Sequence, residues 1–177
     1  MIPKFPAFAI STTLFLTFAG CATAPVIHSS GDNSAKFSSA QTFALLPVSI
    51  DPSVPPAEAP ALTEAAQDGA RDALRTLAYS ETSLTNADLV FYLHGKIMAP
   101  AAVADWGYLP NPSKFGIGSA EVAASAGRRV FVEAYDNHSK RQVWMGWLEC
   151  TCRKVKPEGI QNEIQQIVAT FPPRAKS

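Results

Sequence analysis

Few side chains of this 177-residue chain have the types and spacing that acid–base or metal chemistry needs. The three histidines, His28, His94 and His138, lie far apart, and no two have the spacing of metal ligands. The sequence contains no Gly-x-Ser-x-Gly, His-Glu-x-x-His or phosphate-loop motif. We therefore expect no catalytic residue, no metal and no cofactor. A periplasmic hydrolase would have to assemble its site in three dimensions, and the candidate residues are His94, Asp105, Glu133 and Asp136.

Two of the three cysteines, Cys150 and Cys152, are separated by the single residue Thr151. On a strand they would share one face, about 6–7 Å apart along the chain. Bonded cysteines have Cβ atoms about 3.8 Å apart, so a disulfide would need a bend at Thr151. We expect partly buried free thiols. A structural disulfide and a redox-active pair that senses the thiol state of the envelope are the alternatives.

The third cysteine, Cys21, closes a segment that has the features of a bacterial lipoprotein signal. Lys4 precedes an apolar run of 14 residues, Phe5–Phe18, and Ala19 and Gly20 then lead to the cysteine. The run is shorter than the about 20 residues that span a bilayer. We expect cleavage of residues 1–20 and acylation of Cys21, although Phe18 stands where leucine is usual. An ordinary secretory signal with an unmodified Cys21 is the alternative.

Lipidation would make the membrane itself a partner of this protein, through the N-terminal lipid anchor. Ala22, in place of aspartate, follows the cysteine and resembles the signal for transfer to the outer membrane. We therefore expect the periplasmic face of the outer membrane of a Gram-negative bacterium. The whole chain has 15 basic and 15 acidic residues and no long basic run, so we expect no nucleic-acid partner.

Periodicity and breaker residues divide the mature chain into short elements. Residues 21–36 are small, polar and aperiodic after the cysteine, which predicts a flexible tether. Residues 37–173 are expected to form a single domain, and residues 174–177 a disordered tail. The expected elements are a strand within Phe37–Leu46, a helix from Pro60, a strand within Asp88–Ile97, strands at Arg129–Tyr135 and Val143–Cys150, and a helix from Pro157.

The order of these elements predicts a two-layer α+β domain. Its sheet would be mixed and mainly antiparallel, with about four strands and with two helices on one face. The first strand–helix–strand unit should be parallel. The last two strands should be antiparallel around a turn at residues 136–140, where Asn, Asp and Ser favour turn conformations.

Alternation along the strands predicts an aromatic face on the side of the sheet away from the helices. The apolar residues expected to face the helices are Leu89, Phe91, Leu93, Val130, Val132 and Ala134. The opposite face would then hold Tyr92, Phe131 and Tyr135, with Met145 and Trp147 on the same side. A solvated sheet face is normally polar, so exposed rings there predict a binding surface.

The long segment Ala99–Gly127 is rich in Gly, Pro and Ala and carries Trp106, Tyr108 and Phe115. Rings with this spacing cannot share one face of a helix or a strand. We expect them to form an exposed tip that contacts a partner, and we include them in the predicted binding surface. The alternative is that the segment folds back and covers the aromatic face.

Four short segments occur in a fixed order after the signal: Gln41–Leu45 (QTFAL), Ala87–Val90 (ADLV), Val143–Trp147 (VWMGW) and Phe171–Pro173 (FPP). With these segments the chain resembles the bacterial lipoproteins grouped as domain of unknown function 4136, over about Phe37 to Pro173. Many members carry a stretch rich in Tyr and Gly after the second strand, which only Trp106–Tyr108 and Phe115 echo here. The family has no established activity, so the resemblance implies no catalytic residues.

These observations favour an envelope lipoprotein that acts as a non-enzymatic binding or assembly module. Its aromatic face would hold an envelope protein, an apolar ligand or a second copy of the chain. A hydrolase without a recognisable motif and a thiol-based envelope sensor are the alternatives.

Overall fold

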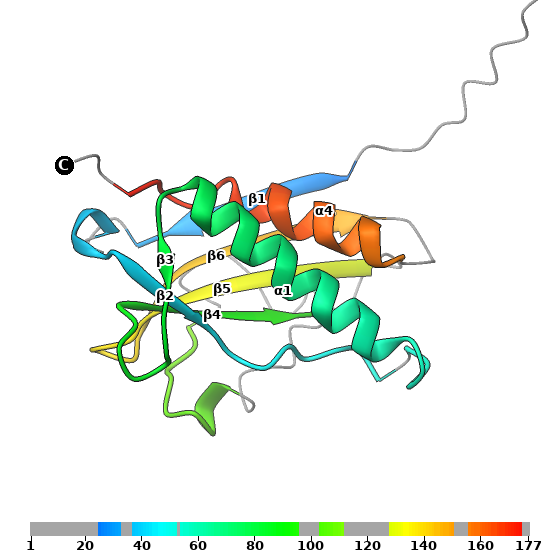
Figure 1. Ribbon diagram of the computed structural model, residues 1–177, viewed down its shortest axis with the longest axis horizontal. Coiled ribbons are helices and arrows are strands. Elements are labelled where there is room, and N and C mark those ends of the chain that lie inside the picture. The colour runs from blue at the N-terminus through cyan, green and yellow to red at the C-terminus, as the bar shows by residue number, and fades with distance from the viewer. Residues whose placement is uncertain are drawn as a thin grey trace, which may run out of the picture.

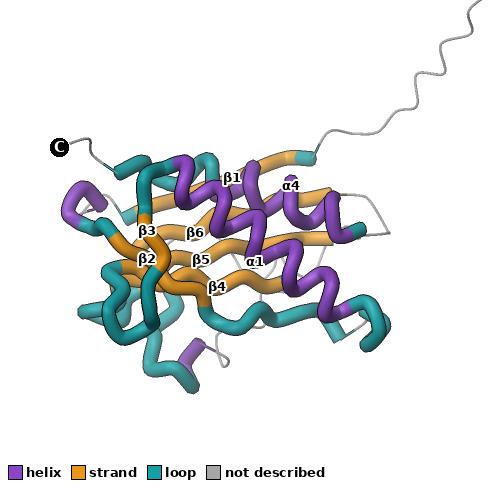
Figure 2. Tube along the Cα trace, viewed as in Figure 1, coloured by secondary structure: helices purple, strands orange, loops and turns teal. Residues whose placement is uncertain are grey.

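The computed structural model describes residues 25–32, 37–52, 54–95, 103–111, 128–150 and 156–174. They form one six-stranded sheet with two helices packed side by side across one face (Figures 1 and 2). The strands are β1 (Val26–Gly31), β2 (Thr42–Leu45), β3 (Ser80–Glu81), β4 (Leu89–His94), β5 (Arg128–Asp136) and β6 (Gln142–Cys150). The two helices on the sheet are α1 (Ala59–Thr76) and α4 (Pro157–Val168), and a short 3-10 helix, η1 (Phe37–Ser39), precedes β2.

The strand order across the sheet is β1-β6-β5-β4-β2-β3. Strand β2 pairs in parallel with β4, and α1 lies in the connection between them. Strands β4, β5, β6 and β1 are each antiparallel to the next. The predicted fold class, a two-layer α+β domain with a mixed, mainly antiparallel sheet, is therefore confirmed.

The sheet has six strands rather than the expected four, and β1 lies inside the segment that the sequence predicted to be a flexible tether. Its sequence, VIHSSG, has no apolar alternation. It pairs with β6 from Val26↔Glu149 to Gly31↔Trp144. The tether prediction was wrong here because the strand is formed by main-chain pairing with β6 and by two side-chain contacts, of Ile27 with the core and of His28 with Trp147, which leave no periodic pattern in the sequence.

The second missed strand, β3, has only two residues and pairs in parallel with β2. At the other end of the chain, the N–H of Arg174 donates to the carbonyl of Leu77 at 3.2 Å. The first residue of the predicted disordered tail is therefore bonded to the domain, and residues 175–177 lie outside the described part.

Both helices begin with a proline in their first turn and bury one stripe of side chains. The stripe on α1 is rich in alanine, and at Gly69 the helix touches α4. A Cβ atom at Gly69 would lie 2.5 Å from the main-chain oxygen of Gln161. The absence of a side chain there lets the two helices pack closely, which holds them as one layer.

The core between the helices and the sheet is centred on Phe171, which lies just after α4 and is 1% exposed. Its ring contacts four other aromatic rings, with centroid distances between 5.1 and 5.7 Å; they belong to Phe37, Tyr79, Phe91 and Trp144. Edge-to-face contacts of this kind add to the free energy of burial. The core therefore ties the C-terminal end of the fold to β4 and β6.

The strand faces are as the sequence predicted. All six residues expected to face the helices are buried in the core under α1 and α4. Tyr92 and Tyr135 belong instead to a second buried cluster on the other side of the sheet. We call the side covered by α1 and α4 the helix face, and the opposite side the second face.

Candidate functional site

Three of the aromatic rings predicted on the second face are buried, contrary to the prediction of an open binding surface, and Trp147 is partly buried. Tyr92, Phe131 and Tyr135 are 3%, 1% and 0% exposed, and Met145 is also buried. Every residue of β4 is buried, so this strand is covered on both sides. Rings of this size leave water because each buries a large apolar area. The rings therefore stabilise the fold and do not present a free surface.

Part of this cover comes from residues 103–111, which lie on the second face below the sheet in Figure 1. Val103 and Tyr108 pack with Tyr92 and Tyr135, and the rings of Tyr108 and Tyr135 are 5.2 Å apart. The segment is also bonded to the β5–β6 hairpin, because the N–H of Leu109 donates to the carbonyl of Lys140 at 2.8 Å. For this part of the long loop, the fold-back alternative is confirmed.

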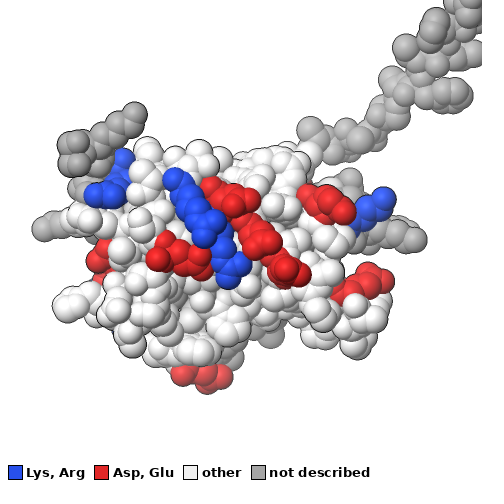
Figure 3. All heavy atoms as spheres, in the orientation of Figure 1, with Lys and Arg blue, Asp and Glu red and all other residues white. Residues whose placement is uncertain are grey.

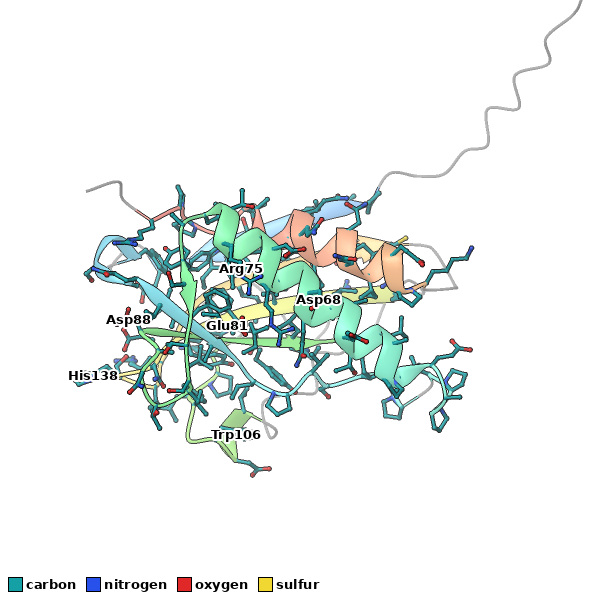
Figure 4. The ribbon with its side chains drawn as sticks, in the orientation of Figure 1. Asp68, Arg75, Glu81, Asp88, Trp106 and His138 are labelled. Atoms are coloured by element: carbon teal, nitrogen blue, oxygen red, sulfur yellow. The ribbon has the colours of Figure 1, made fainter. Side chains whose placement is uncertain are left out.

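Trp106 and Tyr108 are only two residues apart, but a turn of the main chain gives their side chains very different exposure. The N–H of Tyr108 donates to the carbonyl of Val103, and the N–H of Gly107 to that of Ala104. With Gly107 at φ 78°, this is the usual glycine-terminated end of a helical turn. Tyr108 is 1% exposed and Trp106 is 49% exposed. Figure 4 shows Trp106 at the edge of the molecule, away from the helices.

The exposed tip predicted from the sequence therefore holds for Trp106 and is wrong for Tyr108. Phe115, the third predicted binding residue, lies outside the described residues. The pairing of Val103 with Tyr108 around Gly107 is a sequence signal that could have identified the docked ring.

A side-chain amide, Asn137, connects the docked segment to the sheet. Its Oδ1 accepts hydrogen bonds from the hydroxyl of Tyr108 at 2.7 Å and from Nζ of Lys140 at 2.6 Å. Its Nδ2 donates to the carbonyls of Leu84 and Ala87. The Lys140 ammonium also lies 4.7 Å from the centre of the Tyr108 ring. All of these polar groups are used to hold the fold together.

The structure brings two of the four hydrolase candidates together. Nε2 of His94 lies 3.3 Å from Oε1 of Glu133, and both side chains are buried on the second face. The other carboxylate oxygen of Glu133 accepts a hydrogen bond from the hydroxyl of Tyr135. Burial and the charge of Glu133 raise the pKa of Tyr135, which keeps its hydroxyl protonated as the donor.

The other two candidates lie elsewhere. Asp105 is exposed in the segment 103–111. Asp136 ends β5, and its Oδ1 accepts hydrogen bonds from the N–H and the hydroxyl of Ser139 in the hairpin turn. The four residues therefore form no common site, and the pair of His94 and Glu133 is enclosed by stacked rings of Tyr92 and Phe131.

An open groove of about 970 Å³ lies at the end of the sheet where β4 begins and the β5–β6 hairpin turns. Its lining includes Asp32, Asn86, Asp88, Asp136, His138 and Arg141. In Figure 4, Asp88 and His138 mark this end of the molecule.

Asp88 holds β2 against β4 at the edge of this groove. Its Oδ2 accepts hydrogen bonds from the N–H groups of Gln41 and Thr42 at 2.8 and 2.9 Å, and from the Thr42 hydroxyl at 2.8 Å. Partial burial acts to raise the pKa of Asp88, but these hydrogen bonds outweigh it and lower the pKa. The Asp88 carboxylate of the groove is therefore engaged in hydrogen bonds within the fold.

The cysteines give one correction and leave one prediction open. Cys150 is disulfide-bonded, which overturns the expectation of free thiols at this position. Cys21 and Cys152, the only other cysteines of the chain, lie outside the described residues. Among the described residues, no three potential metal ligands cluster, and no helix has the length and apolar character to cross a membrane.

The two edges of the sheet differ. The six residues of β1 are mostly exposed, Val26 is 53% exposed, and none of the six is Asp, Glu, Lys or Arg. At the other edge, β3 has two residues, and Glu81 forms ion pairs with Arg71 and Arg75 of α1 at 2.9 and 3.4 Å. Figure 3 shows basic and acidic side chains side by side on the face of the molecule that carries α1.

Short length and charged side chains are the usual protections of a sheet edge, and β1 has neither. Its only ring contact among the described residues is between His28 and Trp147 of the neighbouring strand, with centroids 4.9 Å apart. Of the two edges of the sheet, β1 therefore offers the longer row of main-chain groups to a partner. Sequence reasoning missed it because the strand itself was not predicted.

No family model and no curated protein sequence matches this chain. Among solved structures, the chain is similar to a PelC dodecamer from Paraburkholderia phytofirmans, with a TM-score of 0.50, 13% identity, and coverage of 86% of this chain and 99% of that one. It is also similar to a DUF4136 family protein from Bacteroides thetaiotaomicron, with a TM-score of 0.49, 13% identity, and coverage of 80% and 95%. Likeness at this identity concerns the fold alone.

Proposed function

We propose that this chain is a lipid-anchored, non-enzymatic assembly module of a Gram-negative envelope. Acylated Cys21 would hold it at the periplasmic face of the outer membrane, and its function would be to associate with further copies of itself or with envelope proteins. The observation that carries the proposal is the open edge of β1, which begins five residues after Cys21. An anchor and an unprotected strand edge are thus adjacent in the chain.

The polar residues of the domain support a binding role over a catalytic one. His94 and Glu133 are buried and paired with each other, and Asp88, Asp136 and Asn137 make hydrogen bonds that connect strands and turns. A catalytic acid or base must reach a proton of the substrate within hydrogen-bonding distance. These five residues are engaged by the protein itself.

Self-association is supported by the fold comparison. The structure that matches with a TM-score of 0.50 is described as a dodecamer, and 99% of that chain is covered. A domain of this fold can therefore form a large homo-oligomer. We extend this property to the present chain as part of the proposal.

The anchor is tested by expressing the full chain in a Gram-negative host and measuring the intact mass of the protein in separated membrane fractions. We expect a chain that starts at an acylated Cys21 in the outer-membrane fraction, and Cys21→Ser should abolish acylation. An unacylated mature chain in the soluble periplasm would refute the anchor.

Assembly is tested separately, by sedimentation velocity of the detergent-extracted protein over a range of concentrations. We expect species larger than one chain. A monomer at every concentration, with no envelope protein co-purifying after cross-linking, would refute the assembly function even if the anchor is confirmed.

A further inference from the structure

The main-chain groups that β1 directs away from the sheet can be identified from its hydrogen bonds. The N–H of Asp32, just after β1, donates to the carbonyl of Val143 at 2.8 Å. In an antiparallel pair, residues that bond the neighbour alternate with residues whose N–H and C=O point the other way. Counting back from Asp32, the residues that bond β6 are Val26, His28 and Ser30, and the residues that point outward are Ile27, Ser29 and Gly31.

These outward groups have no hydrogen-bond partner among the described residues. They supply three N–H donors and three C=O acceptors in a straight row on an exposed edge. Such a row is a template for one more strand. A strand that fits it must match both its length and its side chains.

We propose that β1 pairs antiparallel with β1 of a second copy, with Ser29 opposite Ser29, so that the two sheets join into one. This inference deepens the proposed assembly function and rests on it. The pairing places Ile27 opposite Gly31 and Gly31 opposite Ile27. All three outward residues of each copy then exchange hydrogen bonds with an outward residue of the other, which makes six bonds in total.

The side chains of β1 are self-complementary in this register. The bulky Ile27 faces Gly31, which has no side chain, and His28 faces Ser30. The only acidic group near the edge, Asp32, faces Val26. The two Asp32 residues are about 20 Å apart along the paired strands, so no like charges oppose each other.

The opposite edge of the sheet is a poorer partner for β1. Strand β3 offers only Ser80 and Glu81, and the carboxylate of Glu81 is held by two arginines of α1. A head-to-tail contact would therefore make fewer main-chain bonds than the symmetric contact. Length favours the pairing of β1 with itself.

The predicted anchor is compatible with this pairing. The chain from Cys21 to Val26 reaches at most about 18 Å. Two acylated copies on one membrane would thus have their edges confined to a thin layer, where the effective concentration of each for the other is high. The strand pair would lie along the membrane plane, with one anchor at each end.

The decisive test is cysteine cross-linking of the full-length protein in membranes. In the proposed pair, the Cα atoms of the two Ser29 residues are about 5.5 Å apart, within the range of a disulfide. We expect Ser29→Cys to give a disulfide-linked dimer on oxidation. Val26→Cys is the matched control, because the two Val26 residues would be about 20 Å apart and should give no more dimer than the parent chain.

A second test uses proline at two neighbouring serines. Ser29→Pro removes an outward donor and should weaken self-association tenfold or more, with the unfolding midpoint nearly unchanged. Ser30→Pro removes a donor to β6 and should lower the unfolding midpoint. Together, the two proline variants distinguish loss of the interface from loss of the strand. Ser29→Ala, which keeps the main-chain donor, should behave like the parent chain.

Each other outcome overturns the inference in a recognisable way. An oligomer in which Ser29→Cys gives no dimer, or in which Ser29→Cys cross-links to Glu81→Cys, refutes the symmetric pairing and leaves self-association standing. Cross-linking of Ser29→Cys to a different envelope protein refutes a second copy as the occupant. A monomer in every assay refutes both this pairing and self-association.

Discussion

The two faces of the sheet are buried by different means. On the helix face, α1 and α4 cover apolar side chains, and the largest of these surround Phe171. On the second face, tyrosines pack with a histidine and a glutamate, and a single docked tyrosine, Tyr108, connects them to the hairpin turn. The helix face depends mainly on shape and area, whereas the second face combines apolar packing with specific hydrogen bonds.

This difference explains why aromatic residues on a strand were poor evidence for an exposed site. A tyrosine ring can be buried wherever its hydroxyl finds a hydrogen-bond acceptor, and the Tyr108 hydroxyl donates to Asn137. The proposed contact at β1 therefore rests on open main-chain groups and not on aromatic residues. The faces also predict different responses to mutation.

The largest effect is expected on the helix face, for Phe171→Ala. The substitution empties the centre of five packed rings, so the free energy of unfolding should fall by about 3–5 kcal/mol. Denaturant titration measures this loss. Asn162→Ala, at an exposed position of α4, is the control and should have little effect. A loss well below 1 kcal/mol for Phe171→Ala would show that the helix face is not the principal core.

On the second face, Tyr108→Ala should lower the free energy of unfolding by about 3 kcal/mol. Tyr108→Phe keeps the ring and removes the hydrogen bond to Asn137, and should cost about 1 kcal/mol. Thermal and chemical unfolding of the two variants separate the contribution of the ring from that of the hydroxyl. Equal losses would mean that the ring itself contributes little, contrary to its burial.

A smaller, pH-dependent effect is expected for Asp88→Asn, about 1 kcal/mol at pH 7, because the exposed carboxylate loses charge-assisted hydrogen bonds. The pKa of Asp88 is lowered in the fold, so its contribution is present above the unfolded pKa of about 3.9 and is lost as pH falls through the folded pKa. Unfolding titrations at pH 7 and pH 3 should show the difference from the parent shrink. Asp105→Asn, at an exposed aspartate, should show no such trend.

The smallest effect on stability is expected for Trp106→Ala, within about 0.5 kcal/mol, because half of this side chain is exposed. It lies two residues from Tyr108, so the two variants compare a docked ring and an exposed ring in one segment. A loss of 2 kcal/mol or more in the same titration would mean that Trp106 is also part of the buried face. Red-shifted, readily quenched tryptophan emission that Trp106→Ala removes would agree with its exposure.

The periodic patterns of apolar residues in the sequence predicted most of the fold. The alanine-rich stripe on α1, the alternation of β4 and the hairpin of β5 and β6 each place several apolar residues on one side. Burial of those residues is the main driving force, so their spacing determines the element and the face. Strands β1 and β3 carry no such pattern and were missed.

The candidate site was predicted less well than the fold. Cys21 and Phe115 lie outside the described residues, and the lipid anchor remains a prediction. Trp106 is exposed as expected, whereas Tyr92, Tyr108, Phe131 and Tyr135 are buried. Whether a ring on a sheet face is covered depends on a segment far away in the chain, and periodicity within one strand does not contain that information.

The sequence by itself determined the signal-like N-terminus, the order of the elements other than β1 and β3, the α+β class and the helix-facing residues of β4 and β5, because these follow from local patterns. Only the tertiary structure decided that Tyr108 docks on Tyr135, that His94 meets Glu133, and that VIHSSG becomes an edge strand. Each of these contacts joins residues that are distant in sequence through hydrogen bonds or ring packing. Such contacts depend on the three-dimensional arrangement that the core imposes, so no periodic pattern in the sequence indicates them.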